Sequence, residues 1–113
     1  MLKSFRAYQR SLEFHQCCTK VKGPPYLLEQ LQRAAASITL NLAEGYGRFG
    51  VADRRKFYRI AFASARECQA ALDLLPESTP RETARKLADE MAAATYSLCR
   101  IMDKQHKKQT GLE

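Results

Sequence analysis

Long hydrophobic runs are missing from this sequence. No apolar stretch approaches the ~20 residues that a helix needs to cross a membrane. The N-terminal residues MLKSFRAYQR also lack the apolar core of a signal peptide. The sequence therefore indicates neither a membrane protein nor a secreted one, and we expect it to stay in the cytoplasm.

Residues with catalytic chemistry are scarce. There are two histidines, His15 and His106, and neither Glu-x-x-His nor His-Glu-x-x-His occurs. We expect His15 to be a hydrogen-bonded core histidine of the first helix rather than a general base. Because an enzyme needs convergent groups of this kind, the sequence predicts a protein that is not an enzyme.

Paired cysteine motifs are missing too, since the four cysteines include no C-x-x-C spacing. A zinc site is conceivable, but its ligands would come from separate turns without paired spacing. Those candidate ligands are His15, Cys18, Cys68 and Cys99. Because a cytoplasmic chain keeps its thiols reduced, we interpret the cysteines as small packing residues. The sequence predicts neither a metal site nor a cofactor.

Patterns typical of β-strands do not occur, because apolar residues neither alternate nor cluster as β-branched runs. They recur instead at spacings of three and four, as on one face of a helix. The predicted helices span about residues 4–21, 25–45, 52–75 and 80–106. Short connections between them favour an all-α, antiparallel up-down-up-down four-helix bundle, a single domain over residues 1–113.

Negative charge is in short supply. Nineteen Lys and Arg against twelve Asp and Glu give a net charge of +7 and a pI near 9.5, which favours RNA, DNA or an acidic protein surface as partner. The densest basic segment is predicted to bind nucleic acid through Arg48, Arg54, Arg55, Lys56, Arg59 and Arg66. The last predicted helix mixes both signs and is interpreted as a solvated face. Where this helix frays at its end, Lys104, Lys107 and Lys108 are expected to form a flexible basic tail.

The third predicted helix separates apolar from charged residues. At 100° per residue, Arg55, Arg59 and Arg66 fall within about 40° of one another. Tyr58 and Phe62 lie beside them, and arginines interleaved with aromatic rings can hold phosphates and stack on unpaired bases. The alternative is an ordinary charged outer face, with Phe62 in a subunit contact. The apolar seam predicted on the opposite side comprises Phe57, Ile60, Ser64, Cys68, Ala71 and Leu75.

A G-x-G-x-x-G string runs from Gly45 to Gly50. A dinucleotide-binding fingerprint needs a β-strand before the first glycine, and here the preceding residues are helical. We therefore interpret the string as a helix end and a turn. Gly45 or Gly47 is expected to adopt the left-handed conformation that caps many helices.

The second predicted helix has no charged residue between Arg33 and Glu44. A helix without a charged side is usually buried all round, which one bundle cannot do, so this stretch indicates burial between subunits. We expect Glu44 to bond a backbone amide or an arginine across that interface. The predicted interface residues are Ala36, Ser37, Leu40, Asn41, Glu44, Tyr58 and Phe62. The alternative is that the polar members satisfy one another inside one chain.

Two runs, QLQRAAASITLNLAEGYGR and RRKFYRIAFASARECQAAL, resemble a known family. They are similar to four-helix-bundle proteins encoded in bacterial rRNA intervening sequences. The same structural group includes Avd, the accessory variability determinant of diversity-generating retroelements. The resemblance covers about residues 5–75 and is most specific in an S-I-x-x-N-x-A-E-G core that begins at Ser37. Gln32 and Thr39 depart from the pattern, because the family often has a basic residue and a proline there.

This resemblance implies a barrel-like homopentamer of bundles without enzymatic activity. For the Avd branch it also implies binding to a reverse transcriptase and to nucleic acid. We therefore expect a non-catalytic basic scaffold that self-assembles and binds RNA or DNA together with a protein partner. Two alternatives stay open. One is an rRNA intervening-sequence protein outside retroelements, and the other is a module that binds an acidic partner and no nucleic acid.

Overall fold

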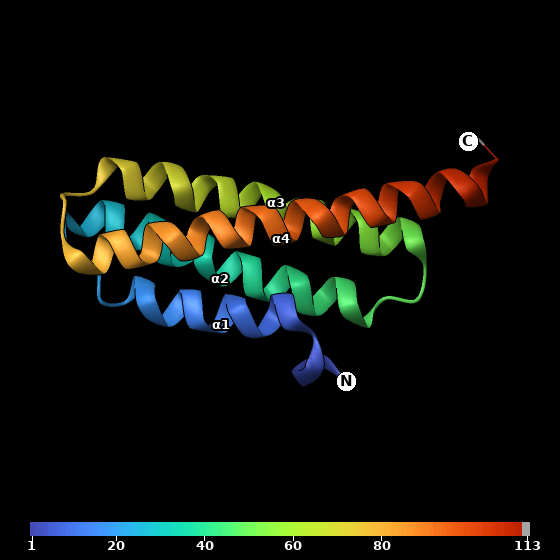
Figure 1. Cartoon of the computed structure of the whole chain (residues 1–113), viewed down its shortest axis with the longest axis horizontal. Coiled ribbons are helices and arrows are strands. Elements are labelled where there is room, and N and C mark those ends of the chain that lie inside the picture. The colour runs from blue at the N-terminus through green and yellow to red at the C-terminus, as the bar shows by residue number, and fades with distance from the viewer. Residues whose placement is uncertain (112–113) are drawn as a thin grey trace.

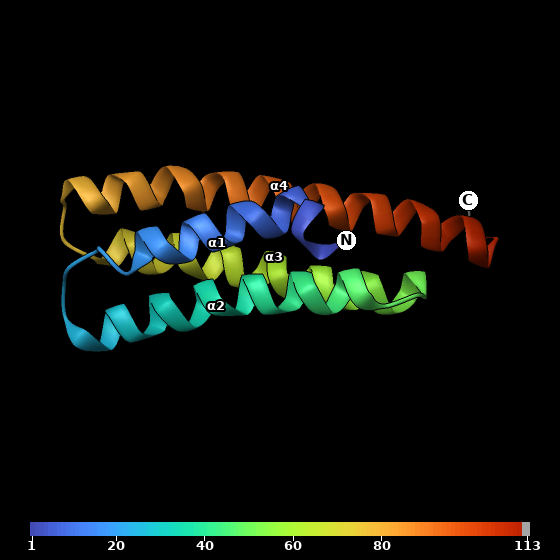
Figure 2. The same cartoon turned by 90° about the horizontal axis from the view of Figure 1, so that it is seen from below.

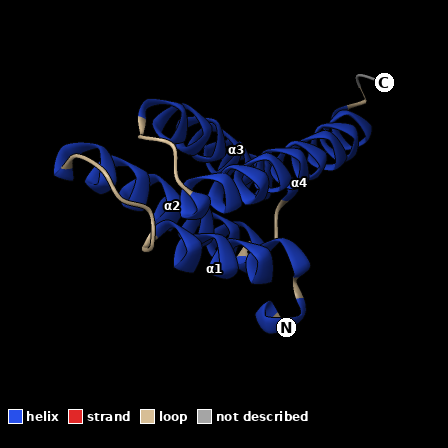
Figure 3. Cartoon of the chain, turned by 60° about the vertical axis from the view of Figure 1, so that its left-hand side comes forward, coloured by secondary structure: helices blue, strands red, loops and turns tan. Residues whose placement is uncertain are grey.

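Residues 1–111 are described by the structure, a computed structural model. After a 3-10 turn at Leu2–Ser4 they form four helices: α1 Arg6–Cys18, α2 Pro25–Gly47, α3 Val51–Leu74 and α4 Thr79–Thr110. This part of the chain contains no strand (Figure 3). Consecutive helices run antiparallel, and α1 packs on α4 as well as on α2 (Figures 1 and 2). The arrangement is that of an up-down-up-down four-helix bundle.

The inner seam of α2 forms the centre of the core. Its residues follow the predicted spacing of three and four, and all are fully buried: Leu31, Ala35, Ile38 and Leu42. Phe14 of α1, Leu72 of α3 and Met91 of α4 belong to the same core cluster. Alanines fill many of the remaining buried positions, including Ala34, Ala61, Ala65, Ala84 and Ala88. These small side chains let the helices approach one another closely.

The predicted seam of α3 is wrong in its first half. Ile60 is 39% exposed and Phe57 is only half-buried, whereas Tyr58 is 3% exposed. The reason is Gly45 on α2, where an added Cβ would lie 2.5 Å from Cε1 of Tyr58. Because this glycine has no side chain, the Tyr58 ring packs on the backbone of α2 and points into the core. From Ser64 to the end of α3 the predicted seam is confirmed.

The expected left-handed glycine cap is also wrong. α2 continues through Gly45 and Gly47, and its C-cap is Arg48 in an extended conformation with φ −85° and ψ 144°. Within residues 1–111 only Gly23 and Gly111 have positive φ. The G-x-G-x-x-G string is therefore a helix end followed by a short turn, as expected, but Gly45 is required for close packing rather than for its backbone angle.

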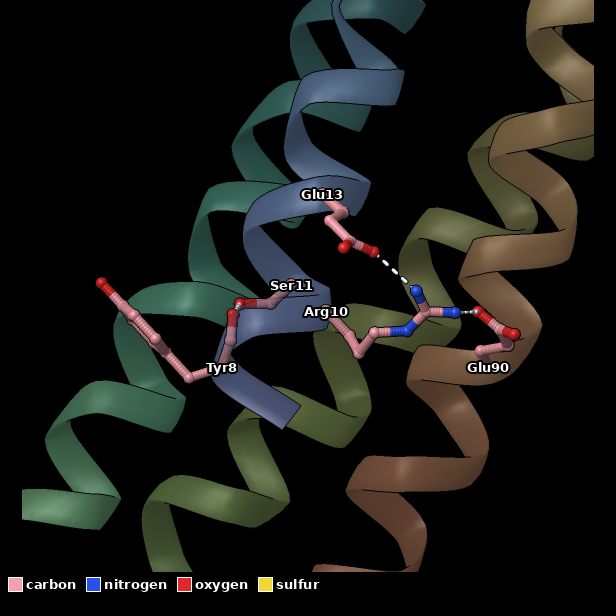
Figure 4. A network of polar contacts seen from close by, with 5 residues as sticks. All are labelled: Tyr8, Arg10, Ser11, Glu13 and Glu90. Atoms are coloured by element: carbon pink, nitrogen blue, oxygen red, sulfur yellow. Dashed lines mark hydrogen bonds and ion pairs between the residues drawn. The ribbon is translucent and has the colours of Figure 1, made fainter. Parts of the chain in front are cut away.

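α1 is joined to both of its neighbours by polar contacts. The guanidinium of Arg10 lies between Glu13 of the same helix and Glu90 of α4, and it donates to both carboxylates (Figure 4). On the other side, the buried hydroxyl of Ser11 accepts a hydrogen bond of 2.9 Å from Oγ1 of Thr39 on α2. The Arg10 ion pairs are exposed, so each contributes little stability. Together these contacts fix the position of α1 along the α2 and α4 helices.

The contact between Gly45 and Tyr58 predicts opposite effects for two glycines of α2. Gly45→Ala should lower the melting temperature, because overpacking costs roughly 1–3 kcal/mol and the helix-propensity gain of alanine offsets at most about 1 kcal/mol of it. Gly47→Ala is the matched control, because a Cβ there meets nothing within 4 Å. It should leave the melting temperature unchanged or raise it. Thermal unfolding followed by circular dichroism measures both, and equal melting of the two variants would contradict this packing.

Candidate nucleic-acid interface

The outer edge between α3 and α4 carries a regular series of contacts, which we call the α3–α4 ladder. The contacting pairs are Arg55 with Asp103 (2.6 Å), Phe62 with Tyr96 (ring centroids 5.7 Å apart) and Gln69 with Asp89 (2.8 Å). Each pair lies seven residues from the next on both helices, the repeat of coiled-coil packing. The ladder thus fixes the register in which residues 55–69 of α3 lie beside residues 89–103 of α4.

At one end of the ladder a single carboxylate holds two arginines. Oδ1 of Asp103 accepts from Nε of Arg55 at 2.6 Å and from Nη2 of Arg59 at 3.3 Å. The Arg55 hydrogen bond is the main cause that lowers the pKa of Asp103 below its ordinary value of 3.8. One carboxylate cannot neutralise two guanidinium groups, so this site keeps a net positive charge.

α4 adds further cations to this site. The i, i+3, i+4, i+7 spacing from Arg100 to Lys107 includes Asp103 and places these residues on one face of α4. Because Asp103 of this face contacts Arg55 and Arg59, the face lies on the side of α4 that adjoins α3. The resulting surface, which we call the basic face, comprises Arg55, Arg59, Arg100, Lys104 and Lys107.

The contribution of α4 was missed by sequence reasoning. Lys104, Lys107 and Lys108 were expected in a flexible tail, but α4 continues to Thr110 and ends at Gly111, whose φ of 72° is left-handed. In Figure 1 this end of α4 projects beyond the other helices. The spacing from Arg100 to Lys107 is the pattern that indicates a basic stripe here, although the oppositely charged Asp103 within it is also typical of a solvated face.

Arg54, predicted to bind nucleic acid, has a structural contact instead. Its Nε donates to the carbonyl oxygen of Arg48 at 2.6 Å, and its Nη2 donates to that of Tyr46 at 3.5 Å. The last carbonyls of a helix have no partner within the helix, so this side chain caps α2 in place of the expected glycine. The structure does not bring Arg54 into the basic face.

Three more of the predicted basic residues lie elsewhere on the surface. Arg48 pairs with Glu44 one turn earlier on α2 at 2.9 Å, so Glu44 bonds within its own helix rather than across an interface. The Phe57 ring lies 5.0 Å from the Arg48 guanidinium and 5.5 Å from Nζ of Lys56. Arg66 donates to Gln69 at 3.0 Å. It lies about 10 Å from Arg59 along α3, given seven residues of helical rise.

The residues predicted to form the subunit interface fall into two groups, those with contacts inside the single chain and those that remain at least partly exposed. Ser37 bonds Ser64 of α3 at 2.8 Å, and Nδ2 of Asn41 donates to the carbonyl oxygen of Ser37 at 2.8 Å. The alternative of polar groups satisfied inside one chain is therefore the correct one for Ser37 and Asn41. Tyr58 is likewise a core residue of the single chain, and Phe62 packs on Tyr96 in the ladder.

In the single chain Ala36 is half-buried and Leu40 is 65% exposed, and their predicted place in a subunit interface stays a prediction. His15 lies near them, half-buried in a shallow hollow beside Leu12 and Thr39. The expectation that His15 sits in the core is therefore wrong, because this side of α1 faces outward past the edge of α2.

The cysteines are packing residues, as predicted. All four are free thiols; Cys18, Cys68 and Cys99 are buried and Cys17 is half-buried. Burial raises the pKa of Cys18 to about 12 and also raises that of Cys68. Among the residues that the structure describes, no three His, Cys, Asp or Glu side chains are grouped to hold a metal ion. No helix within residues 1–111 is both long and apolar enough to cross a membrane.

The fold and the basic face define a small, all-helical bundle with one strongly positive edge. The model of the 23S rRNA-intervening sequence protein family matches residues 3–98, and the chain belongs to that family. The match confirms the resemblance and extends it from about residue 75 into α4. The comparison with curated proteins returned no match. A relation to Avd in particular stays a prediction.

The buried thiols predict selective alkylation. In the native protein at pH 8, iodoacetamide should modify Cys17 and leave Cys18 and Cys68 unmodified, because burial keeps these two thiols protonated and inaccessible. Tandem mass spectrometry of the digested protein separates the adjacent Cys17 and Cys18. After unfolding in guanidinium all four cysteines should react. Native labelling of Cys68 as fast as Cys17 would contradict its place in the core.

The Asp103 contacts predict a pH-dependent stability. Because the folded pKa of Asp103 is lower than the unfolded one, its contribution is present above about pH 4 and is lost as the pH falls through the lowered folded value. At pH 7, Asp103→Asn should therefore be less stable than the wild type by about 0.5–1 kcal/mol, the range of part-exposed ion pairs. Urea unfolding near pH 2.5 should show a smaller difference. A pH-independent difference would mean that the charge of Asp103 has no role in it.

Proposed function

We propose that this chain is a non-catalytic, homo-oligomeric scaffold that binds nucleic acid, RNA in the first place, on its basic face. The observation that carries the proposal is the charge of that face, where five cations of α3 and α4 accompany one carboxylate that pairs with two of them. The 23S rRNA-intervening sequence family supports RNA as the natural polyanion to test first. DNA is the second.

The basic face has the groups that phosphate binding needs. Lys104 and Lys107 are exposed on α4, and Arg59 is 54% exposed, so all three can contact a strand that follows the α3–α4 edge. Contacts of this kind release counterions from the nucleic acid, and the affinity they give falls steeply with salt. They carry no base sequence information, so we expect binding with little sequence preference.

An aromatic side chain lies next to these cations. Tyr96 of the ladder is 49% exposed, and the Arg100 guanidinium lies 5.9 Å from its ring centroid. An exposed ring beside cations can stack on an unpaired base, which favours single-stranded over double-stranded nucleic acid. Phe62 supports the Tyr96 ring from α3. This pair replaces the predicted pair of Tyr58 and Phe62, because Tyr58 is buried.

A binding role fits the placement of the histidines better than catalysis does. His15 lies on α1 near the end of the bundle where α4 begins, whereas His106 lies on the projecting end of α4 (Figure 1). The contact of Arg10 with Glu90 sets α1 against α4 so that about twenty residues of helix, roughly 30 Å, separate the two histidines. Groups so far apart cannot act on one substrate.

Self-assembly is the second part of the proposal. On the outer side of α2, Leu40 is 65% exposed and Ala36 is half-buried, and α2 has no charge between Arg33 and Glu44. Copies of the chain are proposed to bury this surface between them. The family resemblance implies five subunits, and a ring would repeat the basic face around its circumference. Such repetition raises the effective concentration of binding sites along one polymer.

The proposal predicts a charge-specific loss of binding. Lys104→Gln with Lys107→Gln removes two cations without touching Asp103. The slope of log affinity against log salt for a fluorescent single-stranded RNA should then decrease by about 2, roughly one unit per lost phosphate contact. The matched control is Lys20→Gln with Lys22→Gln, two exposed lysines near the α1–α2 turn, which should bind as the wild type does. Fluorescence anisotropy measures both.

Equal losses in the two double variants would mean that binding depends on net charge and not on the basic face. A wild-type chain that binds neither RNA nor DNA at 50 mM salt would contradict the proposal altogether. That result would favour an acidic protein as the partner.

A further inference from the structure

The outer side of α2 carries a second apolar seam. Ala36, Leu40, Ala43 and Gly47 follow spacings of four, three and four residues, so they share one side of the helix, opposite the core seam. Leu40 is 65% exposed. In a single chain Ala36 and Ala43 are half-buried and Leu40 and Gly47 are exposed, which leaves an apolar strip partly open to water on a helix that also buries a full inner seam.

A hollow lies where the outer seam meets α1. It has a volume of about 180 Å³ and is lined by Leu12, His15, Ala36, Thr39 and Leu40. Its walls are mainly apolar, and no lysine, arginine, aspartate or glutamate lines it. We call it the α1–α2 hollow. A hollow of this kind fits an apolar side chain better than a charged or strongly polar one.

An aromatic side chain projects from the other end of the same seam. Phe49 lies in the turn between α2 and α3 and is 101% exposed, so its ring packs on none of residues 1–111. Both of its neighbours, Arg48 and Gly50, have extended backbone conformations. A fully exposed phenylalanine therefore lies about 15 Å from an apolar hollow, given some ten residues of helical rise.

We propose that Phe49 of one chain inserts into the α1–α2 hollow of a second copy, head to tail. This inference rests on the proposed self-assembly and specifies the contact that makes it. Because each chain has one Phe49 and one hollow at different places, every copy donates to one neighbour and accepts from another. A contact of this heterologous kind closes into a ring when the rotation between copies allows it.

The charge distribution favours a second copy over another partner. Chains with a net charge of +7 repel one another, and the outer seam offers a surface without lysine or arginine along which two copies can approach. An acidic partner would bind the basic face instead. In the four-helix arrangement the α1–α2 edge lies across the bundle from the α3–α4 edge, so head-to-tail contacts leave the basic face accessible (Figure 2).

A stable interface between two copies has to bury more area than the Phe49 side chain alone provides. One buried aromatic side chain accounts for roughly 200 Å², about a quarter of the ~800 Å² per partner of a stable interface. Leu40 and Ala43 lie between the two ends of the seam and line a second hollow beside Phe49. They provide the neighbouring surface that has to be covered as well. Phe49 is thus the central anchor, and the outer seam forms the rest of the interface.

A mixing experiment with two variants tests the inference. Phe49→Ala removes the inserted ring and keeps the hollow, whereas Leu12→Glu charges the hollow and keeps the ring. Each variant alone should be monomeric, or should assemble only at concentrations at least tenfold higher than the wild type. Mixed in equal amounts they should form a dimer with one copy of each, because one intact ring then meets one intact hollow. Native mass spectrometry resolves the species, since the two variants differ in mass.

Matched controls are Tyr26→Ala for the aromatic and Leu74→Glu for the charge, because both residues are about 70% exposed and lie outside the seam. These variants should assemble as the wild type does. Formation of the mixed dimer also shows that both test variants are folded.

The outcomes separate the two proposals. A monomeric wild-type chain would overturn self-assembly and this contact together. If the wild type is oligomeric but either test variant also assembles normally, the Phe49 contact is wrong and self-assembly still holds. The same conclusion follows if the two variants form no mixed dimer. A wild-type assembly of only two subunits would mean that the contact is reciprocal, and the head-to-tail arrangement would be wrong.

Discussion

α2 carries apolar residues on two opposite sides, and a four-helix bundle can bury only one of them. The inner seam, from Leu31 to Leu42, is fully buried and forms the centre of the core. The outer seam, from Ala36 to Gly47, is only partly covered by the other three helices, and its Leu40 is 65% exposed. The single chain therefore still has a partly exposed apolar surface on α2. This surface is separate from the basic face, which belongs to α3 and α4.

The charged surface depends on how α3 is rotated. Gly45 lets the Tyr58 ring pack on α2, so Tyr58 rather than Phe57 or Ile60 points into the core. With α3 in this rotation, Arg55 turns toward α4 and meets Asp103. The ladder then fixes the register, and the cations of both helices come together on one edge. A single missing side chain on α2 therefore influences the position of a basic face on the far side of α3.

The sequence predicts the elements of this fold well. Four helices, their order and the inner seam of α2 follow from spacings within one helix, and those are visible in the chain. What failed depends on contacts between helices. The seam of α3 changes because a glycine on α2 accepts an aromatic ring, and Ser37 bonds a serine on α3 instead of a second subunit. The α3–α4 register that joins Arg55 to Asp103 likewise depends on both helices and cannot be predicted from the sequence of either one. The contribution of α4 to the basic face was therefore not predicted.

Two separate surfaces are proposed to serve two purposes: the outer seam of α2 joins copies, and the basic face binds nucleic acid. Native mass spectrometry of the wild-type chain, alone and with a short single-stranded RNA, tests this most directly. We predict an assembly with a mass several times 12.8 kDa that adds RNA without changing its number of subunits. A single chain of 12.8 kDa, or an assembly that dissociates when RNA binds, would contradict the proposal that self-assembly and RNA binding use separate surfaces.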